Sequence, residues 1–273
     1  MGHVAMTHKV ENMTIFGDDG FYDKKRGISK VYGNAYMAKT MDDGDTLFLA
    51  ADTLVSIQNK DPKKEKLLAY HAVKIFKNDM QGIADSLAYL SSDSTLFFYH
   101  DPVLWSDENQ MTADSIHMLL KNKNISRIYM VSNSFVVSID SLKDYNQIKG
   151  RRMTSYFENK KIHHVVVQGN GETIYHILEE KELKNDSIKA KITFLSGMNK
   201  TICSNMLINF KDGKVSGINF YVKPDASFFP PQDIKQADRR LKGFTWRGAD
   251  RPKKKDVVKR GQGKKTATND TSN

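Results

Sequence analysis

The chain has 273 residues, 39% of them hydrophobic and 27% charged, and a formal net charge of +10 at pH 7. These values fit a water-soluble chain with one large core or two small ones, and they exclude collagen-like and low-complexity polymers. No stretch approaches the roughly 18 consecutive apolar residues that a membrane-spanning helix needs, so an integral membrane protein is not expected. The single cysteine, Cys203, excludes an intramolecular disulfide framework and a cysteine-rich metal site.

The positive charge is concentrated at the C-terminal end. Residues 239–273 hold twelve of the 42 Lys and Arg residues but three of the 32 Asp and Glu residues, so this segment carries +9 and the rest of the chain +1. Residues 251–273 have almost nothing to bury, which predicts a disordered basic tail that acts mainly as a solvated segment. A tail that binds nucleic acid is the least favoured alternative, because the neutral body has no nucleic-acid-reading motif.

Alternation of apolar and polar residues predicts short strands throughout residues 1–230. The clearest runs are 125–131, 134–139, 162–167, 173–177, 188–195 and 214–222. Turn pairs such as Asp19-Gly20 and Asn170-Gly171 separate the runs, as is typical of hairpins. One short helix is predicted over 231–241, within a closing segment 231–250, because Pro231 suits a helix start and Gly243 a stop.

An internal repeat of about 30 residues organises the body. Ala-Asp-[Ser/Thr]-[Leu/Ile] occurs at Asp52, Asp85 and Asp114, and related triplets occur at Asp45, Asp140 and Asp186. We interpret the triplet as a structural signature, with Asp near a strand start and the following Leu or Ile directed inward. Stacked repeats of this kind form an elongated sheet with unpaired edges at its two ends.

Several segments carry a family resemblance by their order and spacing. They are VYGNAYM at 31–37, DTLFLAADTL at 45–54, GIADSLAY at 82–89, DPVLW at 101–105, MTADSI at 111–116, GRRMTSYF at 150–157, VQGNGETIY at 167–175 and GFTWR at 243–247. In these segments the chain resembles the OstA/LptA-like lipopolysaccharide-transport family, and specifically the longer OstA-like proteins of the Bacteroidetes. The likeness covers most of residues 13–252.

The resemblance implies an elongated twisted β-jellyroll, or β-taco, whose apolar trough shields the acyl chains of lipopolysaccharide. It implies a non-enzymatic periplasmic carrier whose partners are lipopolysaccharide, other transport proteins with the same jellyroll, and further copies joined edge to edge. The N-terminus has no secretory signal pattern, so the chain looks like a fragment and its periplasmic location rests on the family. The Asp-[Ser/Thr]-[Leu/Ile] triplets also look like the O-glycosylation pattern of Bacteroidetes periplasmic proteins.

A structural module that pairs edge to edge with other β-proteins, without a lipid ligand, is the alternative function. For the carrier, strand alternation selects candidate lipid-contacting faces. They are Ile128 and Met130, Val165 and Val167, and Ile218, Phe220 and Val222. Ordinary sandwich core explains the same pattern equally well, because periodicity finds an apolar face but not its ligand.

The sequence lacks the common catalytic and metal-binding motifs. No phosphate-binding loop, nucleotide-binding glycine motif, nucleophile elbow or zinc-protease motif occurs in the sequence. Gly169-Asn170-Gly171 lies between two strand patterns and is expected to be a hairpin turn. Neighbouring strand residues point to opposite faces, so His163 and His164 are not expected to share a metal ion. No catalytic residue, metal or cofactor is therefore predicted.

Overall fold

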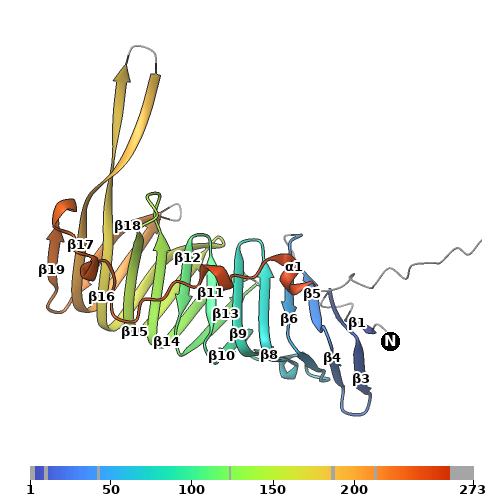
Figure 1. Ribbon diagram of the computed structural model, residues 1–273. Helices are drawn as coiled ribbons and strands as arrows, with labels where there is room; N and C mark the ends of the chain where they lie inside the picture. The colour runs from blue at the N-terminus through green and yellow to red at the C-terminus, as the bar shows by residue number, and fades with distance from the viewer. Residues whose placement is uncertain are drawn as a thin grey trace, which may run out of the picture.

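Strands dominate the computed structural model, which describes residues 4–8, 12–41, 44–122, 124–185, 188–211 and 214–258. Nineteen strands form one continuous, twisted sheet that is folded lengthwise into two layers, with the strands running across the long axis (Figure 1). The all-β, elongated jellyroll predicted from the sequence is confirmed. None of the helices in the described ranges is long and apolar enough to cross a membrane.

The two layers, sheet I and sheet II, share six long strands. Sheet I has its own strands β1 (Val4–His8), β2 (Met13–Gly17), β5 (Tyr36–Thr40), β6 (Thr46–Ala50), β11 (Val103–Ser106), β12 (Asn109–Thr112) and β19 (Asp225–Phe229). Sheet II has β3 (Asp19–Asp23), β4 (Ile28–Tyr32), β7 (Thr53–Ile57), β10 (Thr95–Tyr99), β13 (Ser115–Lys121) and β18 (Lys214–Tyr221). The shared strands are β8 (Lys66–Lys77), β9 (Met80–Leu90), β14 (Asn124–Ile139), β15 (Tyr145–Glu158), β16 (Lys161–Asn185) and β17 (Ile188–Lys211).

The chain bends from one sheet into the other along one long edge, which we call the corner. At the corner, pairs of consecutive residues take positive φ: His71 and Ala72 (62° and 51°) within β8, and Ser132 and Asn133 (61° and 51°) within β14. The ladder of β8 with β9 and that of β14 with β15 shift register at these pairs. A left-handed pair therefore turns the strand without ending it.

The repeated Asp residues lie at the same corner. The backbone N–H of Asp52 donates to the carbonyl of His71 (3.0 Å), and that of Asp114 donates to Ser132 (3.0 Å). The second residue after each repeated Asp is inward and buried, namely Leu54, Leu87 and Ile116. This geometry supports the structural interpretation of the repeat; Asp140 lies instead in the turn after β14, and Asp186 lies outside the described residues.

The two layers approach each other most closely at the corner. Gly150 in β15 shows how little room remains, because a Cβ at this position would overlap Cγ1 of Val167. One hydrophobic core runs along the interior from Ile15 and Val31 to Met206 and Ile208. The inner faces thus bury apolar surface along the whole length of the jellyroll.

Residues 231–258, here called the strap, return along the outer face of sheet I (Figure 1). Two buried glutamines hold its backbone. The amide of Gln147 donates to the carbonyl of Arg239 and accepts from the N–H of Leu241, both at 2.8 Å. The amide of Gln110 contacts Thr245 and Arg247 in the same way, at 2.8 and 2.6 Å.

The prediction of a helix over 231–241 is wrong in position. The strap contains the 3-10 turns η2 (Pro231–Asp233), η3 (Gln236–Arg239) and η4 (Gly248–Asp250), and its short α-helix is α1 (Lys254–Val257). The N–H of Leu241, which a helix over 231–241 would use internally, instead donates to Gln147. A side chain distant in sequence thus replaces the helical hydrogen bond.

The first residues assigned to the disordered tail also differ from expectation. Val257 is fully buried against Tyr36 and Ala50, and the ammonium of Lys254 lies 4.9 Å from the ring centroid of Phe48. Residues 251–258 therefore lie against sheet I, because Val257 and Val258 pack on it. Averaging the composition over residues 251–273 conceals these two apolar residues. The remaining tail residues, 259–273, lie outside the described residues.

Candidate lipid-binding groove

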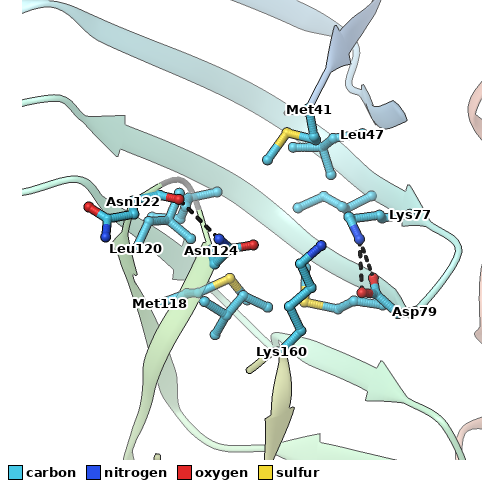
Figure 2. A pocket seen from close by; sticks show the side chains of 13 residues that line it. Met41, Leu47, Lys77, Asp79, Met118, Leu120, Asn122, Asn124 and Lys160 are labelled. Carbon is cyan, nitrogen blue, oxygen red and sulfur yellow. Dashed lines mark hydrogen bonds and ion pairs between the residues drawn. The ribbon is translucent and has the colours of Figure 1, made fainter. Parts of the chain in front are cut away.

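The long edge opposite the corner, here called the mouth, is where the two layers separate. From sheet I it is bordered by Met41, Leu47, Lys77, Asp79 and Met80, and from sheet II by Leu120, Asn122, Asn124, Ile125 and Lys160. Figure 2 shows Lys77 and Asp79 on one side of the pocket, Met118 and Asn124 on the other, and Lys160 extending into the space between them. The mouth is thus bordered by hairpin turns, whereas the corner is closed by continuous backbone.

Two adjoining cavities occupy the interior behind the mouth. Their volumes are 380 and 310 Å³, and both are lined by Met41, Leu47, Ile75, Leu96 and Leu120. Each volume falls in the range of small-molecule and acyl-chain sites. Because the cavities share one wall, together they form one apolar groove along the N-terminal half of the jellyroll.

Methionines make much of the groove adaptable. Met13 and Met37 line the larger cavity, Met80 and Met118 line the smaller one, and Met41 lines both. An unbranched thioether side chain repacks around ligands of different shape at low cost. The lining therefore suits flexible apolar chains better than it suits one rigid ligand.

Basic groups border the groove. Lys77 forms ion pairs with Asp79 (2.8 Å) and Asp45 (3.3 Å). Partial burial, the largest influence, would lower the pKa of Lys77, but the hydrogen bonds and charges of the two carboxylates outweigh it and raise the pKa. Lys160 lines the smaller cavity and Lys39 and Lys66 the larger, so cationic side chains lie beside an apolar interior.

Six of the seven candidate lipid-contacting residues lie on the inner face of sheet II. Cross-strand register places Ile128, Val165 and Ile218 in one row, on the side of the mouth. A second row, nearer the corner, holds Met130, Val167 and Phe220. Ile128, Met130, Val165 and Val167 are fully buried, and Ile218 and Phe220 are partly buried against the same core.

Val222 does not belong to this face. Its side chain is 59% exposed and its φ is 63°, because it opens the left-handed corner between β18 and β19. Strand alternation failed here since the strand ends at Tyr221, one residue before Val222. Of the other candidates, Val165 lines a third cavity of 180 Å³, with Phe157 and Phe210, toward the C-terminal half.

Sequence reasoning missed the residues that line the groove itself. These residues lie close to the turns at the mouth, at the ends of strands, whereas the alternation of apolar and polar residues is clearest at strand centres. They are Met41, Leu47, Leu96, Leu120 and Ile125. A usable signal exists: each is an apolar residue within a few positions of a polar turn. Alternation alone does not distinguish the mouth end of an inner face from the corner end.

The histidine pair is closer than expected. The Nδ1 atoms of His163 and His164 lie 2.7 Å apart, because the ladder of β15 with β16 shifts register beside them, between Tyr156 and Phe157. Burial and the neighbouring His163 lower the pKa of His164. Among the described residues no group of three or more His, Cys, Asp or Glu is placed to hold a metal ion.

Comparison with known proteins adds a structural likeness. No family model matches the sequence, and no curated protein matches it. The structure is similar to that of LptH from Pseudomonas aeruginosa, described as the LptA-homologous periplasmic component of the conserved lipopolysaccharide transport device. The match has 10% sequence identity and a TM-score of 0.37, and it covers 43% of this chain and 82% of LptH.

Proposed function

We propose that this protein is a non-enzymatic carrier that holds the acyl chains of an amphiphile in the groove between its two layers. The observation that carries the proposal is the pair of adjoining apolar cavities behind a mouth with Lys39 and Lys160 beside it. Apolar chains leave water on entering the interior, while an anionic headgroup stays at the mouth near the ammonium groups. Binding and release need no reacting group.

Lipopolysaccharide is the ligand we propose, with a periplasmic location and transport toward the outer membrane as the setting. It combines several acyl chains with anionic phosphates, and the sequence resemblance to the OstA/LptA-like family names the same ligand. The partners proposed with it are other jellyroll transport proteins and further copies joined at the sheet ends. The groove described above supplies the physical basis for the lipid part of this proposal.

The test is binding of lipopolysaccharide to the full chain after delipidation and refolding, followed by native mass spectrometry. Leu120→Trp fills the groove without removing core, so it should abolish the bound glycolipid mass. Ile202→Asp changes a side chain that is 50% exposed on the outer face, so binding should persist. A folded wild-type protein that never acquires the glycolipid mass would refute the carrier proposal.

The alternative, an edge-pairing structural module without a lipid, predicts a different result in the same experiment. Wild type and Leu120→Trp would then form the same oligomers and remain free of glycolipid. The two functions are therefore separated by the ligand mass and not by the oligomeric state.

A further inference from the structure

The outer face of sheet II carries a row of exposed tyrosines. Tyr32, Tyr70 and Tyr99 are 42%, 41% and 41% exposed, and each immediately precedes a left-handed pair at the corner. The register runs from Tyr32 through Thr53 to Tyr70, and on through Ser86 to Tyr99. Small hydroxyl side chains thus separate the rings, so each ring stands clear of the next.

Charge on this face is predominantly positive. Three rows of outward side chains begin in β4 at Ile28, Lys30 and Tyr32 and follow the register to β18. All positions in these rows are described and none is Asp or Glu, but β3 extends the same rows with Asp19 opposite Tyr32 and Asp23 opposite Ile28. Four are exposed cations: Lys30, Arg127, Arg152 and, at the mouth end of its strand, Lys66, which also lines the larger cavity.

Carboxylates occur beside the face, at the corner, but several already have partners there. Asp85 lies 3.2 Å from Nδ1 of His71, and Asp114 accepts from the side-chain amide of Asn133 at 3.0 Å. On the face itself, Asp23 pairs with Arg26 at 3.8 Å, so the four cations leave a net positive charge beside Asp19. This net positive charge favours an anionic partner over a second copy of the chain, which would carry the same net charge.

The apolar side chains on the face favour a lipid surface over nucleic acid. Leu68 lies one row from the tyrosines, and Phe97 in the same row packs against Tyr99 and His117 with ring centroids 6.3 and 4.8 Å apart. Leu68 offers a base no ring, and Phe97 already packs against two rings, so this row suits apolar chains better than stacked bases. Tyrosine instead suits a bilayer interface, where the ring meets apolar chains and the hydroxyl stays in water.

The width of the tyrosine row also fits contact with a lipid surface. It crosses five neighbouring strands, a width of about 19 Å, which is short enough to meet a planar headgroup layer although the whole sheet twists. Lys30 lies over the ring of Tyr32, with 5.8 Å between its Nζ and the ring centroid, so cation and ring reach the same surface. Long basic side chains can keep their charge in the headgroup layer while their stems contact apolar surface.

We propose that the outer face of sheet II docks the protein on a membrane surface of anionic phospholipids, with Tyr32, Tyr70 and Tyr99 at the interface and Lys30 and Arg127 on the headgroup phosphates. Such docking leaves the strap and the groove between the layers unobstructed. It is independent of the carrier function proposed above.

The test is flotation of the full chain with vesicles of phosphatidylethanolamine and phosphatidylglycerol, and with phosphatidylcholine vesicles. We expect binding to the anionic vesicles that weakens as salt rises. Lys30→Gln with Arg127→Gln should weaken it about 25-fold, at about fivefold per cation. Tyr32→Ser with Tyr70→Ser and Tyr99→Ser should weaken it by at least about tenfold.

Matched controls lie on the two-stranded arm that β16 and β17 form beyond the jellyroll (Figure 1). Ile192→Ser with Phe194→Ser removes apolar side chains that are 49% and 40% exposed, and Lys181→Gln with Lys191→Gln removes two charges. Neither control should weaken binding. The Lys30 and Arg127 variant changes exposed cations only, so it tests the proposal even if the tyrosine variant folds poorly.

Three outcomes would overturn the proposal. The first is binding that the face variants leave intact but that neutralising Lys259, Arg260, Lys264 and Lys265 removes, which would assign it to the C-terminal residues. The second is no binding to either vesicle. The third is binding to single-stranded DNA, but not to vesicles, that the face variants abolish.

Discussion

The corner half and the mouth half of the interior share one inner face but behave as two environments. In the row nearest the corner, Leu54, Phe98, Ile116 and Met130 are fully buried. Two positions nearer the mouth on the same strand as Phe98, Leu96 is partly exposed and lines both cavities of the groove. Residues of the same chemistry thus form core or binding site according to the distance between the layers.

The largest loss of stability should come from removing a buried side chain at the corner. Phe98→Ala removes a fully buried ring that lies between Leu87 and Ile116, so it should lower the free energy of unfolding by about 3–5 kcal/mol. Leu96→Ala, on the same strand and face, should cost about 1 kcal/mol. Denaturant unfolding of both variants measures the difference, and equal losses would show that the two halves are packed alike.

Adding volume at the corner should cost less than removing it, but still measurably. Gly150→Ala places a methyl group against Cγ1 of Val167 and should lower stability by about 1–3 kcal/mol. The control is Gly217→Ala, because a Cβ at Gly217 meets no atom within 4 Å. If both substitutions were neutral by denaturant unfolding, the close approach of the layers at Gly150 would be wrong.

Adding volume at the mouth should be tolerated. Leu120→Trp extends into the groove, so it should change the free energy of unfolding by less than about 1 kcal/mol while it blocks ligand entry. Ala69→Leu should have the opposite result. Ala69 is fully buried in the corner row, so the larger side chain should lower the free energy of unfolding by about 1–3 kcal/mol. Thermal melts of the pair rank the two sites, and a larger loss at Leu120 would reverse the assignment.

The ion cluster at the mouth should contribute least to stability. Lys77→Met breaks the pairs with Asp45 and Asp79 and should cost less than about 1 kcal/mol near neutral pH. The pKa of Lys77 is raised above its usual 10.5 by those carboxylates, against the opposing effect of burial. The pairs therefore stabilise the fold fully below pH 10.5, and this contribution is lost as the pH rises through the folded-state pKa.

The free energy of unfolding of Lys77→Met and of wild type, measured across alkaline pH, tests the direction of this change. The difference between them should shrink above pH 10.5. A difference that grows there would mean that Lys77 is buried as a neutral amine.

The sequence predicted the inner faces well because alternation is a local property. Ile128 with Met130 and Val165 with Val167 were selected by period-2 spacing, and the structure brings both pairs onto neighbouring rows of one face. The same rule failed at Val222, where the backbone leaves the strand. The alternation rule also does not indicate how far a residue lies from the corner, so Leu96 and Leu120 at the mouth were not distinguished from core residues.

By itself, the sequence determined the strand content, the inward side of most strands and the repeated Asp corners, because each depends on residues a few positions apart. Tertiary structure decided which part of the inner face opens into a groove, since this depends on the separation of two layers. It also decided the course of the strap, which Gln110 and Gln147 hold across 137 and 94 residues of sequence. No local pattern in residues 231–258 records those partners, so only the folded sheet could select an extended strap over a helix.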